Sequence, residues 1–129
     1  MNGIHLIAEL YECAVTPSLI RADALNTLCQ SICVEHGLEI VGSCFHQFGT
    51  AAQPAGATGA VVLAESHLAI HTWPELGSVT LDLYVCNFSR NNEARAHTAF
   101  ADLIAHFAPG RLEQREITRG ALSMAQTTA

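Results

Sequence analysis

The chain contains no lysine, because all six of its basic residues are arginine. This absence excludes chemistry that needs a side-chain amine, such as a lysine Schiff base, a covalent pyridoxal phosphate link or the lysine of a phosphate-binding loop. A carbonyl cofactor held covalently by this protein must therefore come from another source.

Basic charge is scarce as well. Six basic residues stand against twelve acidic ones, and the formal net charge at pH 7 is −6. The arginines are scattered, so nucleic acid is not an expected partner. Long hydrophobic runs are also lacking: no apolar stretch approaches the roughly 20 residues that cross a bilayer. Residues 1–10 show no basic segment followed by an apolar one, so we expect a cytoplasmic protein with no membrane partner.

The cysteines do not form pairs in the sequence. There are five, an odd number, and none belongs to a CxxC motif, which argues against a disulfide framework and a zinc knuckle. We expect most of them to be small buried residues. The five positions are Cys13, Cys29, Cys33, Cys44 and Cys86.

The length of 129 residues fits one domain, and an apolar content of 50% supplies its core. The first half of the chain predicts a strand, a helix and two more strands. The helix starts near Thr16-Pro17 and ends at Gly37, and a loop rich in Gly, Ala and Pro covers 49–59. The three strands are expected over Ile4–Tyr11, Leu38–Phe48 and Ala60–Glu65.

The second half predicts two strands, a helix and a strand. Polar and apolar residues alternate over 67–72 and 79–86, and turn residues at 74–78 join these runs into an antiparallel hairpin. A helix begins at Asn91 or Asn92 and ends at Pro109-Gly110, and a last strand covers 112–118. We therefore predict an α+β fold, a two-layer sandwich with two α-helices on one face of an antiparallel β-sheet.

Reactive side chains are densest at Glu65, Ser66 and His67, followed by His71. A hairpin turn centred near residue 76 would place Ser66 opposite Cys86, with Cα atoms roughly 4.5–5.5 Å apart. An ideal strand separates Ser66 from His71 by about 16 Å, so contact between them requires a bend.

The run Ala64–Glu75 resembles the processing and active-site signature of the bacterial and archaeal S-adenosylmethionine decarboxylases. These are small proenzymes of polyamine biosynthesis that cleave themselves and use a pyruvoyl group. Matching segments spread the resemblance over nearly the whole chain. They are His5–Glu9 with Cys13, Phe45–Phe48, Gly56–Gly59 and the strand of Cys86.

The resemblance implies self-cleavage between Glu65 and Ser66. The Ser66 hydroxyl would attack the Glu65 carbonyl, and elimination would leave chains 1–65 and 66–129, the second with a pyruvoyl group in place of Ser66. Such a cofactor is made from the backbone, which agrees with the missing lysines. His71 matches the histidine that assists processing as a base, and Thr58 falls where the family commonly has a serine.

The resemblance also implies roles in decarboxylation. The substrate amine would form a Schiff base with the pyruvoyl group, and Cys86 matches the acid that returns a proton. A thiol with a reference pKa of about 8.5 is mostly protonated at neutral pH, as that role requires. Glu75 matches a ribose-binding carboxylate, although a solvated turn residue is the alternative, and Phe48 matches an aromatic that stacks on adenine. The family implies a homodimer of cleaved protomers.

Departures from the family pattern leave alternatives open. Residues 76–78 replace the usual Tyr-Gly-Tyr, Asn87 replaces a glycine after Cys86, and the loop before Thr58 is longer. The same pyruvoyl machinery could act on arginine or ornithine, or the chain could be a non-processing regulatory partner of a decarboxylase.

Readings outside the family are weaker. A Ser66–His71 hydrolase lacks the G-x-S-x-G elbow. Zinc ligation by His67, His71 and Cys86 lacks a second ligand pair, and the other histidines are expected to be surface or core residues, so no metal site is predicted. Residues 56–59 lack the GK[ST] of a phosphate loop.

Overall fold

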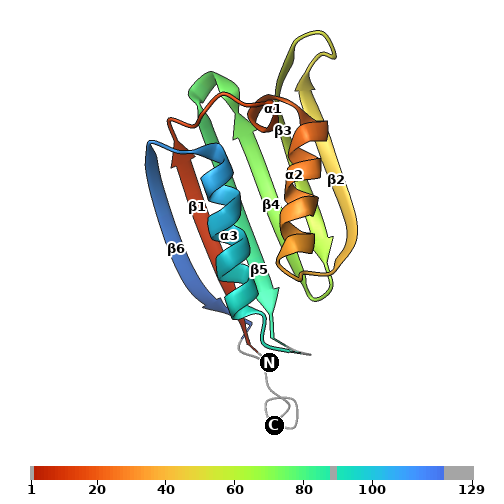
Figure 1. The fold of residues 1–129 in the computed structure, drawn as a ribbon, viewed down its shortest axis with the longest axis vertical. Coiled ribbons are helices and arrows are strands. Elements are labelled where there is room, and N and C mark those ends of the chain that lie inside the picture. The colour runs from red at the N-terminus through yellow and green to blue at the C-terminus, as the bar shows by residue number, and fades with distance from the viewer. Residues whose placement is uncertain (1, 88–89, 121–129) are drawn as a thin grey trace.

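The computed structural model describes residues 2–87 and 90–120, and within them six strands form one antiparallel sheet in the order β2-β3-β4-β5-β1-β6 (Figure 1). The strands are β1 (Gly3–Tyr11), β2 (Ile40–Gly49), β3 (Pro54–Leu63), β4 (Ser66–Trp73), β5 (Ser78–Cys86) and β6 (Arg111–Arg119). Helices α2 (Ala22–Glu35) and α3 (Glu93–Phe107) lie side by side on one face of this sheet. The predicted α+β two-layer architecture is confirmed.

The core lies between these two helices and the sheet. Apolar residues recur every three or four positions in each helix, which gives each one a buried stripe. In β5 the alternating residues Val79, Leu81, Leu83 and Val85 are all buried beneath the helices. Fully burying one such side chain contributes roughly 1.5–3 kcal/mol. The stripes are Leu25, Cys29, Ile32 and Cys33 in α2 and Ala96, Ala99, Phe100, Leu103, Ile104 and Phe107 in α3.

The other face of the sheet is here called the open face. It carries Thr58, Ala69, His71, Asp82 and Tyr84, which alternate along their strands with the buried residues. None of the described helices covers it (Figure 1).

The predicted first helix is interrupted. Arg21 has φ −112° and ψ 132°, an extended conformation, and this residue separates the single turn α1 (Pro17–Ile20) from α2. Gly37 follows the end of α2 with a φ of +76°, as expected of a glycine that terminates a helix. None of the described helices is long and apolar enough to cross a membrane.

The loop predicted over 49–59 is wrong for most of its length, because β3 begins at Pro54. Its small residues serve close packing inside the sheet. A Cβ at Gly59 would overlap the Phe45 ring, and a Cβ at Gly56 would meet the Thr72 carbonyl oxygen at 2.6 Å. The small residues that are typical of a loop therefore occur here in a strand, because neighbouring side chains pack directly against its backbone.

The β4–β5 hairpin is confirmed, but its predicted register is wrong by one residue. Trp73 pairs with Ser78 and His67 with Tyr84, so paired positions sum to 151 rather than 152. The cause is the loop itself: a 3₁₀ turn, η1 (Pro74–Leu76), and the left-handed Gly77 make four connecting residues. Continuing this register places Ser66 opposite Val85, so the Ser66 and Cys86 side chains project from opposite faces of the sheet.

Candidate active site

Ser66 begins β4, directly after a tight turn. Leu63 pairs with Ser66, which leaves Ala64 and Glu65 as the two connecting residues. Glu65 has a φ of +67°, and for a residue with a Cβ this left-handed conformation costs roughly 1–2 kcal/mol. The Ala64 amide donates to the Glu39 carbonyl at 2.9 Å and fixes the turn. The peptide bond between Glu65 and Ser66 therefore lies beside a strained residue in a held turn.

Cys86 is the neighbour predicted for Ser66. In the structure the contact is made by the Cys86 backbone, not by its thiol. The Cys86 backbone N–H donates to Ser66 Oγ at 3.3 Å, although the Cys86 thiol lies on the other face. The Cys86 carbonyl in turn accepts from the buried Asn92 side chain at 3.1 Å. Sequence reasoning treated Asn92 only as a helix cap, because its partner lies outside the helix it begins.

A cavity of about 400 Å³ opens beside the turn. Ala64, Glu65 and Ser66 contribute to its wall, and so do Arg90 and Asn92. The Arg90 guanidinium donates to the Gly37 carbonyl at 2.8 Å and closes one side. The predicted cleavage point is therefore accessible to a small molecule.

Thr58 and His71 form a second group at the opposite end of β4. They are paired across β3 and β4, and Thr58 Oγ1 lies 2.5 Å from His71 Nδ1. The His71 ring also stacks on Trp73 with a centroid separation of 5.9 Å. This pair belongs to the open face and stands about 16 Å along the strand from Ser66. One chain alone does not bring His71 to the Ser66 hydroxyl.

Phe48 and Glu75 lie at the same end of the sheet as His71. Phe48 is 44% exposed, and its ring meets His46 edge to face at 5.0 Å. His46 pairs with Thr58, so this aromatic edge adjoins the Thr58–His71 pair. Glu75 is exposed in the η1 turn, two residues after Trp73. An aromatic face and a carboxylate thus border the second group.

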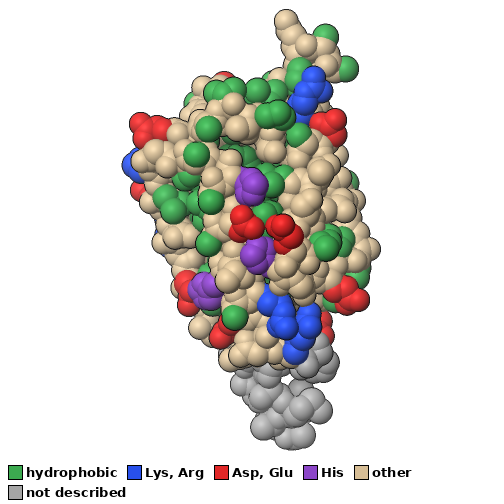
Figure 2. All heavy atoms as spheres, viewed as in Figure 1, with side chains coloured by type: hydrophobic (Ala, Val, Ile, Leu, Met, Phe, Trp, Pro, Cys, Tyr) green, Lys and Arg blue, Asp and Glu red, His purple; other side chains and the backbone are tan. Residues whose placement is uncertain are grey.

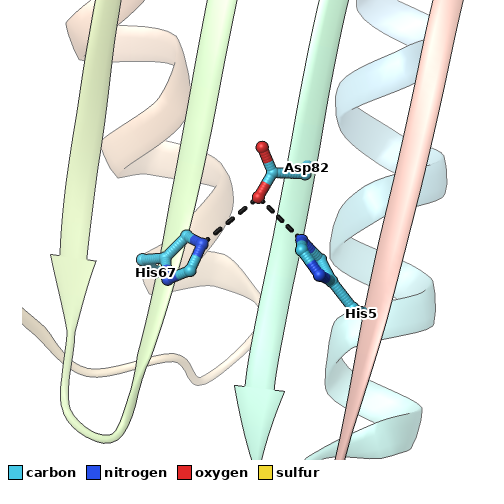
Figure 3. Close-up of side chains that lie close together, drawn as sticks. All are labelled: His5, His67 and Asp82. Atoms are coloured by element: carbon cyan, nitrogen blue, oxygen red, sulfur yellow. Dashed lines mark hydrogen bonds and ion pairs between the residues drawn. The ribbon is translucent and has the colours of Figure 1, made fainter. Parts of the chain in front are cut away.

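His5, Asp82 and His67 meet in the middle of the open face, from three adjacent strands (Figure 3). Both histidines place Nε2 near Asp82 Oδ2, at 2.9 Å for His5 and 3.2 Å for His67. Sequence reasoning missed this cluster because its members are far apart in the chain. The only local signal was the polar side of the β5 alternation, which contains Asp82.

Tyr84 connects this cluster to Cys86. Its ring meets His5 and His67 at centroid distances of 5.9 and 5.7 Å, and the Arg119 guanidinium lies 4.3 Å above it. Burial raises the pKa of the Tyr84 phenol, and the adjacent Cys86 side chain adds to this. Arg119 opposes the shift because its positive charge favours the phenolate.

The arrangement does not support the hydrolase and zinc alternatives. Ser66 projects toward the helices and His71 toward the open face, so they do not form the nucleophile–base pair of a hydrolase. His67 contacts Asp82 while His71 contacts Thr58, so the proposed zinc ligands are not gathered at one point.

Comparison with known proteins agrees with the resemblance. The sequence model of the S-adenosylmethionine decarboxylase family matches residues 4–120. The S-adenosylmethionine decarboxylase proenzyme of Picrophilus torridus is 38% identical over 119 residues, covering 92% of this chain and 84% of the relative. The proenzyme of Thermoplasma acidophilum is 41% identical over 119 residues, covering 92% and 83%.

A solved structure is similar over the same extent. The crystal structure of the adenosylmethionine decarboxylase from Aquifex aeolicus superimposes with a TM-score of 0.81 at 30% sequence identity. The match covers 95% of this chain and 93% of the solved one. Together with the family match, this shows that the chain belongs to the S-adenosylmethionine decarboxylase family.

Proposed function

We propose that this chain is a self-processing proenzyme that decarboxylates S-adenosylmethionine with a pyruvoyl group made from Ser66. The observation that carries the proposal is the position of Ser66 in the family signature, directly after the left-handed Glu65 and on the wall of a cavity. Relatives that bear the name of S-adenosylmethionine decarboxylase proenzyme support it.

Processing uses groups of the chain itself. Ser66 Oγ bonds to the Glu65 carbonyl carbon and the C–N bond between the two residues breaks, which gives an ester. Elimination then releases residues 1–65 with a carboxylate at Glu65 and leaves dehydroalanine at position 66. Its imine tautomer adds water and loses ammonia, which gives the pyruvoyl group on residues 66–129. The Cys86 amide that donates to Ser66 Oγ holds the hydroxyl in place before attack. The left-handed conformation of Glu65 raises the energy of the intact turn, so cleavage relieves strain.

A pyruvoyl group supplies a carbonyl that condenses with the substrate amine and withdraws electrons as CO₂ leaves. The chain has no lysine, so a carbonyl cofactor made from its own backbone agrees with its composition, and Ser66 lies on the wall of a cavity where a substrate could reach it. The Cys86 thiol then returns a proton to the substrate carbon, which requires the free end at position 66 to turn toward the open face after cleavage, because the two side chains project from opposite faces in the intact chain. Glu75 binds the ribose hydroxyls, and the exposed Phe48 ring stacks on the adenine.

We also propose a homodimer of cleaved protomers. The Ser66–Cys86 end and the Thr58–His71 end of β4 lie too far apart within one chain for His71 to assist Ser66. Two copies that face each other across their open faces, related by a two-fold axis, bring the Thr58–His71 pair of one to the Ser66–Cys86 end of the other, where the Cys86 thiol lies on the same face. Exposed Val62 and Ile117 belong to this face and would be buried by the pairing.

Carboxyl-labelled S-adenosylmethionine, arginine and ornithine, offered in parallel, test the substrate. We expect labelled CO₂ only from S-adenosylmethionine. Release of labelled CO₂ only from arginine or ornithine would show that the assigned substrate is wrong, while the pyruvoyl mechanism would still hold.

Two cysteine variants test the acid. Cys86→Ala should process normally and lose most turnover, because proton transfer by a positioned group contributes roughly 10²–10⁴-fold. Cys44→Ala, at an exposed cysteine, should retain full turnover. Full turnover in Cys86→Ala would show that another group is the acid.

A further inference from the structure

Two histidines and two carboxylates lie on the helix-covered side of the molecule, next to Gly37 and outside the proposed active site. His36 follows the last residue of α2, Glu35, while Asp102 and His106 stand four positions apart on α3 and therefore on one side of that helix. Figure 2 shows histidine and acidic side chains together over the seam between the two helices.

Asp102 is the centre of this cluster. Its Oδ2 lies 2.9 Å from His36 Nε2, and its Oδ1 lies 3.6 Å from His106 Nε2. A carboxylate oxygen of Glu35 is also near, because the ligand atoms of Glu35, His36 and Asp102 all lie within 4.8 Å of one another. One imidazole nitrogen and two carboxylates thus converge at the end of α2 and on α3, while His106 approaches the other oxygen of Asp102.

These distances suit a transition-metal ion. Zinc binds histidine nitrogen and carboxylate oxygen at about 2.0–2.2 Å, so neighbouring ligands of a tetrahedral site stand about 3.3–3.5 Å apart. The ligand atoms of Glu35, His36 and Asp102 all lie within 4.8 Å of one another, and the His36–Asp102 separation of 2.9 Å is slightly shorter than this value. Imidazole combined with carboxylate favours zinc and its neighbours over magnesium or calcium, which prefer oxygen ligands alone.

We propose that Glu35, His36 and Asp102 form a binding site for a divalent transition-metal ion of the zinc type, with His106 beside it on α3. The ion replaces the hydrogen bond between Asp102 and His36 with coordinate bonds and fastens the end of α2 to α3. The site goes beyond the sequence-based expectation of no metal. It needs no partner copy, because all three ligands come from one chain.

The position gives the ion a structural role. Glu35 and His36 precede the proposed cleavage point, while Asp102 and His106 follow it. The ion therefore ties together the two chains that processing produces, a consequence that rests on the proposed function. Metal binding itself does not depend on cleavage, and the uncleavable Ser66→Ala protein should bind the ion as well as the wild type does.

The strand cluster of His5, His67 and Asp82 is the competing location. It also offers three ligands, but both of its imidazoles approach the same oxygen of Asp82, which leaves that oxygen shared between two hydrogen bonds. It also lies on the open face, which the proposed dimer covers. The experiment must therefore distinguish the two clusters.

Zinc titration by calorimetry and the visible absorption of bound Co²⁺ test the site on metal-free full-length protein. We expect one ion per chain and a higher unfolding temperature with zinc present, because a ligand that binds only the folded state stabilises it. His36→Ala and Asp102→Asn should each weaken binding at least roughly tenfold, the loss that even indirect changes around a metal site produce.

Matched controls locate the ion. His97→Ala removes an exposed α3 histidine whose Nε2 contacts Glu116 at 3.1 Å, and it should leave zinc affinity unchanged. His5→Ala should also leave it unchanged, and circular dichroism should show that each variant is folded. Loss of binding in His5→Ala but not in His36→Ala, or no binding in the wild type, would overturn the proposal. Zinc binding by Ser66→Ala tests the metal site independently of the proposed function, because this variant cannot cleave itself.

Discussion

The Thr58–His71 hydrogen bond is the contact on which processing should depend most at the scale of single residues. Thr58 Oγ1 is 2.5 Å from His71 Nδ1, close enough to hold the ring and pass a proton. Thr58→Val keeps the shape and removes the hydroxyl, so we expect self-cleavage to slow by about 10²-fold or more. The measurement is the fraction of cleaved chain against time on a denaturing gel.

Thr58→Ser is the control for that experiment. It keeps the hydroxyl and loses only a methyl group, so it should process at nearly the wild-type rate. Equal rates for the valine and wild-type proteins would show that the hydroxyl has no part in processing.

The buried cysteines should make stability fall at alkaline pH. Burial raises the pKa of the Cys33 thiol from 9.0 to about 11 and also raises that of Cys29. Between these values the unfolded thiol loses its proton while the folded one keeps it, so the free energy of unfolding falls as pH rises above 9. Denaturant midpoints measured from pH 8 to pH 11 should show this decline.

Cys33→Ala should decline less steeply than the wild type over the same range, because one of the titrating thiols is gone. Cys44→Ala, at an exposed position, should follow the wild-type slope. Identical slopes in all three proteins would exclude the buried thiols as the cause.

At the scale of elements, the glycine in the middle of β3 is required by packing. A Cβ at Gly59 would overlap the Phe45 ring, which packs against the core. We expect Gly59→Ala to lower the free energy of unfolding by roughly 1–3 kcal/mol, the usual cost of overpacking. Gly42→Ala is the matched control in the adjacent strand, since a Cβ there meets nothing within 4 Å. Equal denaturant midpoints for the two variants would contradict this account.

The elements that the sequence predicts well are those whose burial follows a local period. The alternation over 79–86 and the apolar stripes of the two helices place β5, α2 and α3 correctly. The prediction of a loop over 54–59 is wrong because the glycines there are required by close contacts with Phe45 and Thr72, which are distant in sequence. The predicted β4–β5 register is wrong by one residue because the alternation of polar and apolar residues does not indicate the length of the loop, which has four residues and a 3₁₀ turn.

The candidate site follows the same division. The signature around Ser66 could be predicted from the sequence because its residues are consecutive. The pairing of β4 with β5 could also be predicted, because a short turn joins the two strands. The hydrogen bond from Asn92 to Cys86 and the meeting of His5 with Asp82 depend on strand order and helix placement. No local pattern carries that information.

At the scale of the whole molecule, the open face should be the dimer interface. Val62 is 48% exposed and pairs with His67 on that face. A glutamate at this position would be buried without a partner, so Val62→Glu should be monomeric where the wild type is dimeric. Sedimentation equilibrium measures the masses.

Val34→Glu is the control, because Val34 is 68% exposed on α2 and so lies on the helix-covered side. It should remain a dimer. A wild-type protein that sediments as a monomer would remove the second copy from the account of the active site.

The most direct test of the whole account is the intact mass of the purified protein under denaturing conditions. We predict two chains, residues 1–65 and residues 66–129, the second with a pyruvoyl group in place of Ser66, and a single uncleaved chain for Ser66→Ala. A single wild-type chain of 129 residues would contradict self-processing and point instead to a non-catalytic relative of the decarboxylases.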